Sequence, residues 1–426
     1  MKKVIAATIL ALTLLAQGRQ ISPVPLPRTT LVDLDPTPYD RAMLQEALDA
    51  GEIFTFLAKS SRTEDPDLVE QRRAYAMLFR LGGNGNGASY RVAFLVPAKK
   101  IGKYAASTTE SALAYLAQRN RPFEMEVFTV PDEENATLEG TLVNLSGFNL
   151  VIAPVTAQGA AYLCSRDLPG RFFIPTLNRK TLECDNGMVS FGGIDYDRQI
   201  ETLSYLVEPN GTAYAVSDRS RLSRNLTETV RRYVDLNGTI VIGKNGYYKD
   251  VIERYDDLND STIFLNVPVV RSSLFLSQMT LADFKPRRLL STQLNYSPLL
   301  LTLTQYHDRE NLVVASSIGE MDPYLSENIA LVGQDIRFNW INYATVTGLD
   351  DDFAAATGDR RLGSDTFVDG NIDYTVRLYD AGLYRFIPRE VPRPEEEIIG
   401  PYEEEPLPDD GAVDEPSVFS QEESSE

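Results

Sequence analysis

The sequence predicts an α/β protein with two doubly wound lobes. From residue 90 onward, short apolar segments typical of buried strands alternate with helix-like segments of about 10–15 residues. About eight such units follow one another, which fits either one barrel or two lobes. The alternation then ends in "SDTFVDGNIDYTVRLYDAGLYRF" (364–386), a hairpin-like pattern around the Asp369-Gly370 turn. An antiparallel ending disfavours a closed barrel and favours two lobes.

The first residues have the layout of an export signal, which we assign to residues 1–18. Lys2 and Lys3 precede a hydrophobic run from Val4 to Ala16, and small residues end at Gly18. The run is too short to span a bilayer, which needs roughly 20 residues, although an uncleaved anchor stays an alternative. No cysteine follows the run, so a lipid anchor is not expected. We therefore predict a periplasmic protein.

A proline-rich spacer (19–37) and a helical segment with a linker (38–89) follow the signal. In "YDRAMLQEALDAG", Asp40 is a candidate N-cap and Gly51 a stop. "DPDLVEQRRAYAMLFRLGG" repeats this plan with Asp65, and "NGNGAS" (84–89) marks a boundary. We find no catalytic motif in this segment.

The main domain is expected at 90–387. The first lobe would take about 90–208 with part of 320–360, and the second about 209–319 with the hairpin at 361–387. Among the strand candidates are "YRVAFLVP", "FEMEVFTV", "FNLVIAP", "RFFIPTLN", "GTAYAVSD" and "STIFLNVP".

An acidic tail, 388–426, is predicted to be disordered because it has few apolar residues and clustered charge. The whole chain has a formal net charge of −20, and the residues from Pro394 onward include 13 Asp or Glu and no Lys or Arg. The tail would either dock a basic partner or only aid solubility. No basic surface typical of nucleic-acid binding is evident.

Cys164 and Cys184 are the two cysteines of the 426 residues. An exported chain meets an oxidising compartment, so a single disulfide is the natural interpretation. Two free buried thiols are the alternative.

Patterns for catalysis or metal binding are weak, so we predict a non-enzymatic protein with no cofactor and no metal site. The single His307 follows a leucine-rich helix, where an imidazole more often contacts the last carbonyl groups. "LDDD" (349–352) lacks the Gly and Glu of a calcium loop, and we interpret it as a solvated helix end. Acidic glycosylation sequons occur at Asn135, Asn237 and Asn259; chance matches are the alternative.

Several segments, taken in order, resemble the type I periplasmic binding protein family, which includes branched-chain amino-acid binding proteins. They are "VAFLVPAKKIGKYAASTTESALAYL", "LVIAPVTAQGAAYL", "FFIPTLN", "TAYAVSDRSRLSRNLTETVRRYV" and the closing hairpin. The resemblance covers about 300 residues, from Tyr90 to Ile387, and implies two Rossmann-like lobes. "IGKYAAS" and "DSTIFLNVP…SLFLSQM" are loosely similar to bacterial outer-membrane activators of a peptidoglycan synthase.

The resemblance also implies a ligand cleft at the carboxyl ends of the strands, near positions 97, 154 and 175. A helix after "LVIAP" would present free backbone N–H groups to a carboxylate or another anion there. The residues that match the family's ligand-binding positions are Lys103, Tyr104, Thr156, Gln158, Thr176, Asn178, Asp218 and Arg221. Alternatively, these loops simply cap helices and turns.

Two departures from the family argue against an α-amino-acid ligand. "PTLNRKT" stands where the family has a run of small residues, and "AKKIGKY" lacks the Gly-x-x-Ser-Gly pattern. We predict a ligand-binding or regulatory protein of the cell envelope, and we favour a regulator similar to a peptidoglycan-synthase activator. It would act by lobe closure and contact with an envelope or inner-membrane protein, with a polar small molecule as a candidate ligand. The alternatives are a solute receptor of an ABC transporter and a structural scaffold with a vestigial cleft.

Overall fold

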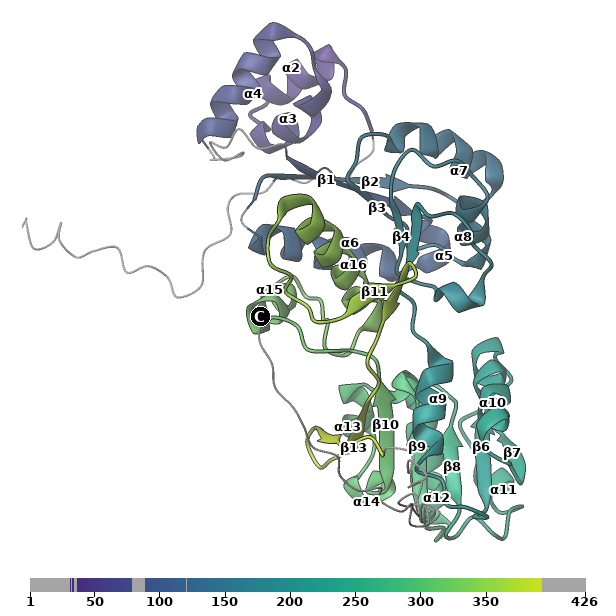
Figure 1. Cartoon of the computed structure of the whole chain (residues 1–426). Coiled ribbons are helices and arrows are strands. Elements are labelled where there is room, and N and C mark those ends of the chain that lie inside the picture. Colours follow the sequence, from purple (N-terminus) through teal and green to yellow (C-terminus); the bar gives the residue numbers. More distant parts are fainter. Residues whose placement is uncertain (1–30, 32, 34–36, 79–88, 120, 393–426) are drawn as a thin grey trace, which may run out of the picture. The chain divides into compact units, whose positions relative to one another are not determined.

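The computed structural model describes residues 31, 33, 37–78, 89–119 and 121–392. The expected signal peptide, most of the spacer, most of the "NGNGAS" linker and the tail beyond residue 392 lie outside these residues. Within the described part, a small helical unit is followed along the chain by two α/β lobes (Figure 1).

The helical unit forms where the sequence places its caps. The Asp40 side chain accepts the N–H of Met43 at 2.9 Å, and Gly51 follows the helix with φ +74°. Leu44, Phe56 and Leu68 belong to its own small core. Its helices are α2 (Arg41–Asp49), α3 (Ile53–Lys59), the short 3-10 helix η1 (Ser60–Arg62) and α4 (Pro66–Leu78).

The first lobe contains a seven-stranded sheet in the order β11-β12-β5-β4-β3-β1-β2. All neighbours pair in parallel except β11 and β12. The strands are β1 (Tyr90–Val96), β2 (Phe123–Thr129), β3 (Leu150–Ile152), β4 (Phe172–Ile174), β5 (Val189–Phe191), β11 (Thr366–Val368) and β12 (Asn371–Asp373). The helices are α5 (Ala98–Ile101), α6 (Tyr104–Gln118), α7 (Asn135–Leu142), η2 (Val143–Leu145), α8 (Ala157–Cys164), η3 (Arg179–Thr181), α15 (Pro323–Leu331) and α16 (Trp340–Thr357).

The second lobe repeats this plan in the order β14-β13-β10-β9-β8-β6-β7. Its strands are β6 (Ala213–Ser217), β7 (Gly238–Val241), β8 (Thr262–Leu265), β9 (Arg288–Ser291), β10 (Leu312–Ser316), β13 (Arg377–Ala381) and β14 (Phe386–Arg389). Its helices are α9 (Tyr196–Ser204), α10 (Arg221–Tyr233), α11 (Lys249–Ile252), α12 (Val269–Leu281), η4 (Gln293–Asn295), α13 (Pro298–Leu303) and α14 (Tyr306–Arg309). Here β13 is antiparallel to both β10 and β14.

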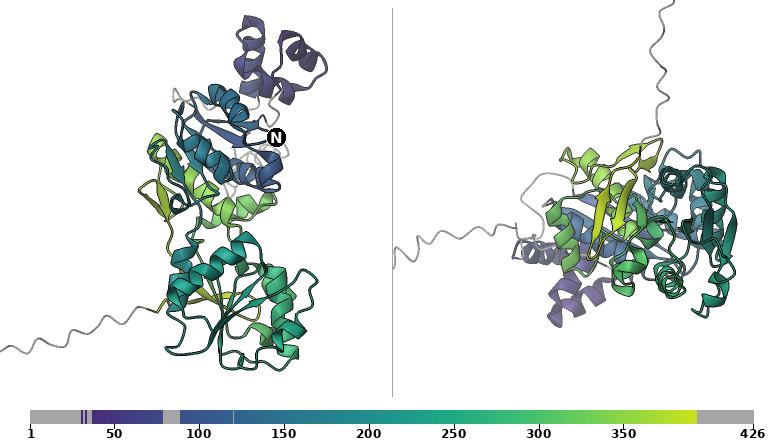
Figure 2. Two further views of the ribbon diagram at one scale, coloured as in Figure 1. Left: turned by 90° about the vertical axis from the view of Figure 1, so that its right-hand side faces the viewer. Right: turned by 90° about the horizontal axis from the view of Figure 1, so that it is seen from below.

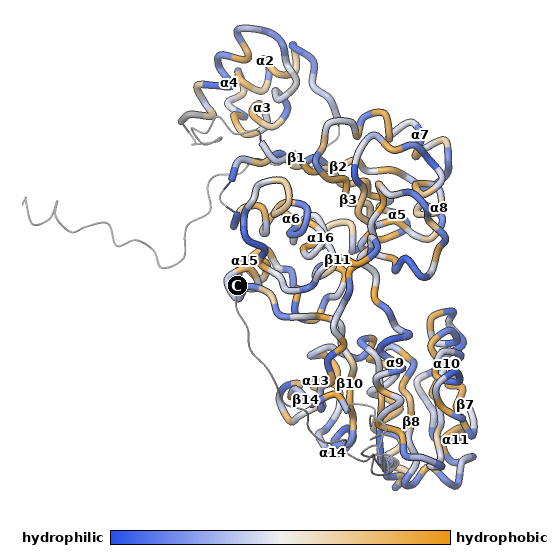
Figure 3. The backbone as a smooth tube through the Cα atoms, viewed as in Figure 1, coloured by the Kyte–Doolittle hydropathy of each residue, from blue (hydrophilic) through white to orange (hydrophobic). Residues whose placement is uncertain are grey.

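Helices cover both faces of each sheet (Figures 1 and 2). Along β1, Val92 and Phe94 belong to one buried cluster, whereas Ala93 and Leu95 belong to another. Because successive strand side chains point to opposite faces, a strand covered on both sides must be apolar throughout. Hydrophobic stretches accordingly run along strands such as β1 and β3, and shorter ones occur in the helices (Figure 3). The predicted fold class is confirmed.

The C-terminal segment divides between the two sheets, and this corrects one expectation. We expected all of 361–387 in the second lobe, but β11 and β12 join the first sheet and only β13 and β14 join the second. The turn at Asp369-Gly370 does connect an antiparallel pair, as predicted. The chain therefore crosses between the lobes three times, at 192–195, 317–322 and 374–376, which we call the crossing segments.

Candidate functional site

The predicted cleft begins at three neighbouring strand ends. β1, β3 and β4 lie side by side in the first sheet and end at Val96, Ile152 and Ile174. Since these strands are parallel, their carboxyl ends meet at one edge of the sheet, where open α/β sheets bind ligands. The loops after them, with the helix starts that follow, contain six of the eight residues predicted to line the cleft.

The backbone N–H groups at the start of α8 are not free, contrary to our expectation. The carboxylate of Glu133 accepts the N–H of Thr156 at 2.7 Å and the N–H of Gly159 at 3.2 Å. The Thr156 hydroxyl also donates to it. Glu133 is 1% exposed, and it comes from the loop between β2 and α7. An internal carboxylate therefore occupies the position that the sequence offered to an external anion.

Thr156 and Gln158 surround this carboxylate rather than an open cavity. Thr156 caps α8 by accepting the N–H of Gln158, whose side-chain amide donates to the carbonyl of Glu133 at 3.4 Å. Gly159 gives the carboxylate room, because a Cβ at this position would lie 3.1 Å from the Glu133 Cδ atom. The Thr156 cap and the buried Glu133 carboxylate together accept the backbone N–H groups at this end of α8.

Two further predicted residues hold the loop after β4. The Thr176 hydroxyl donates to the carbonyl of Val155, joining the loops of β3 and β4. Asn178, which is 5% exposed, donates to the carbonyl of Gly193 at 3.1 Å and accepts the N–H of Lys180 at 3.0 Å. Gly193 lies in the first crossing segment, so Asn178 ties the β4 loop to that segment.

Lys103 and Tyr104 lie at the start of α6. The exposed Lys103 side chain lies over the Tyr104 ring, with its ammonium 5.5 Å from the ring centroid. Burial raises the pKa of Tyr196 to about 12, and the nearby Tyr104 adds to this increase. Tyr196 is the first residue of α9, so Tyr104 lies near the first crossing segment.

Of the two predicted residues in the second lobe, Asp218 is buried and Arg221 is exposed. Asp218 is 8% exposed, forms an ion pair with Arg271 and accepts the N–H of Ser220 at 3.0 Å. Burial opposes its ionisation, but the hydrogen bonds with Ser220 and the Arg271 charge lower its pKa below the usual value. Arg221 is exposed at the start of α10. Asp218 thus has a structural partner already.

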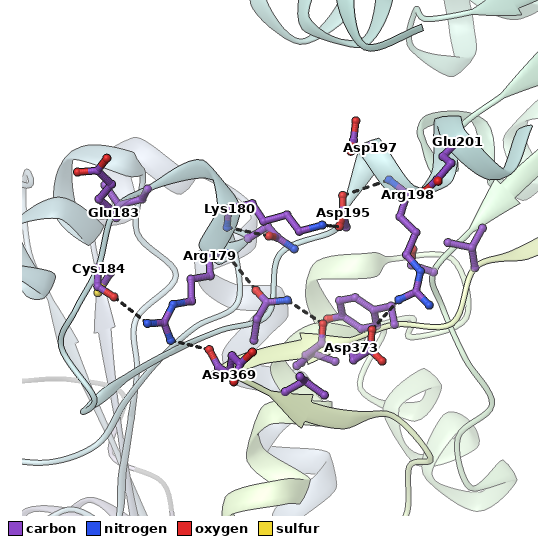
Figure 4. A pocket seen from close by; sticks show the side chains of 18 of the residues that line it. Arg179, Lys180, Glu183, Cys184, Asp195, Asp197, Arg198, Glu201, Asp369 and Asp373 are labelled. Atoms are coloured by element: carbon purple, nitrogen blue, oxygen red, sulfur yellow. Dashed lines mark hydrogen bonds and ion pairs between the residues drawn. The ribbon is translucent and has the colours of Figure 1, made fainter. Parts of the chain in front are cut away.

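A pocket of about 670 Å³ lies beside the crossing segments (Figure 4). Its wall combines the loop after β4, the start of α9, the turn between β11 and β12, and parts of all three crossing segments. Asn178 is the one predicted ligand-binding residue in this wall. The charged residues of the wall are Arg179, Lys180, Glu183, Asp185, Asp195, Asp197, Arg198, Glu201, Asp369 and Asp373.

The cysteines meet as predicted. The Cα atoms of Cys164 and Cys184 are 5.3 Å apart, and the sulfur atoms are at bonding distance. The Cys184 carbonyl accepts a hydrogen bond from Arg179 at 3.0 Å, so the bridge also fixes one end of the pocket wall.

The "LDDD" segment is not a solvated helix end, and this interpretation was wrong. Asp350 is fully buried in α16, where it accepts the Tyr115 hydroxyl at 2.8 Å and the N–H of Gly363 at 3.0 Å. Asp352 is 3% exposed and accepts the Tyr90 hydroxyl at 2.7 Å. These carboxylates are structural, and no group of three potential metal ligands was found among the described residues.

Sequence reasoning missed Glu133 and the pocket residues for the same reason. Several of their partners are between 15 and 192 positions away along the chain, as in the pairs Lys180–Asp195, Thr156–Glu133 and Arg179–Asn371. One signal was available: Gly159 follows "TAQ" near the start of a helix, where glycine is unfavourable unless another group approaches closely.

No protein-family model matches the chain, and no curated protein matches its sequence. Solved structures do match. The leucine-, isoleucine-, valine-, threonine- and alanine-binding protein of Brucella ovis superposes with a TM-score of 0.53 at 10% identity, covering 71% of this chain and 95% of that one. An amino acid ABC transporter substrate-binding protein of Pseudomonas fluorescens gives 0.51 at 12% identity, covering 72% and 97%.

LpoA of Haemophilus influenzae gives a TM-score of 0.48 at 9% identity, covering 83% of this chain and 72% of that one. We draw no functional conclusion from this lower score. In the described part of the chain, no helix has both the length and the apolar character needed to cross a membrane. The strand order of both lobes, the three crossing segments and the two superpositions with TM-scores above 0.5 show that the chain has the type I periplasmic binding protein fold.

Proposed function

We propose that this chain is a non-enzymatic, exported ligand-binding or regulatory protein of the cell envelope, and that it is not a receptor for free amino acids. The observation that carries the proposal is the Glu133 carboxylate at the start of α8. A free amino acid would have to displace this buried anion before its own carboxylate could use the same N–H groups.

The three crossing segments support action by movement of the two lobes about a hinge. Hinge motions concentrate changes in a few loop residues between packed bodies. Binding, of a ligand or of an envelope partner, would then shift an equilibrium between lobe arrangements by its differential affinity for them.

The proposal is tested by thermal shift of the full mature chain against free amino acids, with Glu133→Ala as the informative variant. We expect no saturable stabilisation of the wild type. In Glu133→Ala the N–H groups of α8 lose their partner, which costs about 1–3 kcal/mol, and millimolar acetate should recover part of the loss. Glu134→Ala, at the exposed neighbouring position, is the matched control.

A saturable rise in the wild-type melting temperature with leucine would contradict the proposal if Thr156→Ala with Thr176→Ala abolished it. That result would favour the transporter-receptor alternative. The partner part is tested separately, by a pull-down from envelope extracts with and without residues 394–426. Identical partners after truncation would remove the docking role of the acidic tail but leave the cleft argument intact.

A further inference from the structure

The pocket beside the crossing segments is lined by more carboxylates than cationic side chains. Three cationic side chains line it, and all three are engaged by other wall residues. Lys180 donates to Asp195 at 2.6 Å, and Arg198 contacts Asp373 at 2.6 Å. Arg179 donates to the carbonyl groups of Asp369 and Cys184. Lys180 and Arg198 are therefore neutralised by ion pairs, whereas Arg179 is held by carbonyl groups without an ion pair among the described residues.

The carboxylates of the wall outnumber these cations. Asp195 and Asp373 have the partners just described, and Asp197 pairs with Arg232 at 2.5 Å from outside the pocket. The other four carboxylates have no ion-pair partner among the residues that the structure describes; they are Glu183, Asp185, Glu201 and Asp369. The pocket therefore has an excess of negative charge.

The pocket also has apolar wall groups, which distinguish it from a cluster of surface acids. Val368 is 53% exposed and Leu182 and Val376 are half-buried, so these three side chains present aliphatic surface, whereas Ile372 is 1% exposed and lies behind it. A hydrated metal ion makes no use of such groups, whereas methylene groups of a ligand would bury against them. The cavity of about 670 Å³ is within the size range of small-molecule sites.

We propose that this pocket binds an organic cation with a short aliphatic chain, such as an aliphatic diamine. The ammonium groups would pair with carboxylates that lack a partner, and the methylene groups would contact the aliphatic side chains. This site lies apart from the start of α8, and it does not depend on the envelope role proposed above.

Occupancy of the pocket would act on all three crossing segments. Asp195 lies in the first, Ser317 in the second, and Tyr374 and Val376 in the third. A ligand that contacts them together stabilises one arrangement of the hinge over others, which is how a small molecule biases a two-lobed protein.

The test is isothermal titration of the full mature chain with 1,5-diaminopentane, 1,5-pentanediol and glutarate. These probes share a five-carbon chain and differ in charge. We expect saturable one-site binding of the diamine, at least tenfold weaker binding of the diol and none of glutarate. The affinity for the diamine should fall as the NaCl concentration rises, because the pocket is partly open to solvent.

The double variant Glu201→Gln with Asp369→Asn removes two carboxylates that lack a partner, and we expect it to weaken diamine binding at least tenfold. The matched control is Asp256→Asn with Glu310→Gln, two exposed carboxylates outside the pocket wall, which should leave binding unchanged. Absence of diamine binding, equal binding of the diol, or equal losses in the two double variants would overturn the proposal. Because the readout is binding to the isolated chain, these outcomes leave the amino-acid and partner tests unaffected.

Discussion

The two lobes share one strand order but differ in the charged side chain that each buries most completely. In the first lobe, carboxylates are buried against hydroxyl and backbone N–H groups, as at Asp350. In the second, the fully buried charged group with the largest side chain is a guanidinium, that of Arg309, which donates to the Thr304 carbonyl at 2.6 Å and the Leu383 carbonyl at 3.0 Å. The same backbone plan therefore does not determine how internal polar groups are satisfied.

The lobes also differ at equivalent helix starts. α8 follows the third strand of the first lobe and begins with Thr156 over the Glu133 carboxylate. α12 follows the third strand of the second lobe and begins at Pro268 without a side-chain cap. Of these two helix starts, only that of α8 donates its backbone N–H groups to an internal carboxylate.

The largest effect is expected from Asp350→Ala in the first lobe. It leaves the Tyr115 hydroxyl, the N–H groups of Leu362 and Gly363, and the nearby Arg119 without this carboxylate. Removing one partner of a buried charged network costs about 3–5 kcal/mol. Urea unfolding followed by circular dichroism measures the loss. Asp351→Ala, one residue away and partly exposed, should cost under about 1 kcal/mol; equal losses would refute the structural role of Asp350.

Loss of the disulfide should destabilise the first lobe by about 3 kcal/mol, since it closes a loop of 20 residues. Cys164→Ser with Cys184→Ser is the variant, and hydrogen exchange by mass spectrometry locates the effect. Faster exchange in α8 and the β4 loop is expected, with the second-lobe sheet unchanged. A uniform increase in both lobes would contradict this separation.

Arg309→Met tests the buried cation of the second lobe and should cost about 2 kcal/mol. Methionine fills most of the volume, so the main loss is the hydrogen bonds to the carbonyl of Thr304, which follows α13, and to carbonyl groups of the β13–β14 turn. The urea midpoint is the measurement. The exposed variant Arg254→Met is the control, and a cost no larger than the control would show that Arg309 adds nothing to stability.

The smallest effect is a difference in pH dependence between the lobes. Interactions lower the pKa of Asp218 below its unfolded value, so its contribution is full near neutral pH and is lost as the pH falls through the folded pKa. Burial raises the pKa of Asp352, partly offset by Tyr90 and Arg171, so its ionised form destabilises the fold at neutral pH and acidification relieves this cost.

The two isosteric variants should therefore show opposite slopes. Between pH 7 and about pH 4, the urea midpoint of Asp352→Asn should fall relative to the wild-type value, whereas that of Asp218→Asn should approach the wild-type value only below about pH 4. Slopes of the same sign would show that the two lobes do not differ in this way.

Local patterns determined the parts of this protein that depend on short-range physics. Apolar strands alternating with helices indicated sheets covered on both faces, and the Asp369-Gly370 turn indicated an antiparallel pair. Asp40 capped the expected helix. The two cysteines met because no third competed with them. The strands, the turn and the cap depend only on residues that are close in sequence. The disulfide could be predicted because two cysteines allow only one pairing.

The tertiary structure decided what fills the sites. Glu133 reaches α8 from a loop 23 positions earlier, and Asp350 meets Tyr115 from 235 positions away. The C-terminal strands divided between the sheets because each sheet offered one free edge beside its fifth strand. A charge far along the chain is invisible to local periodicity, yet a buried helix start or tyrosine hydroxyl must find a partner, and only the folded chain shows which residue supplies it.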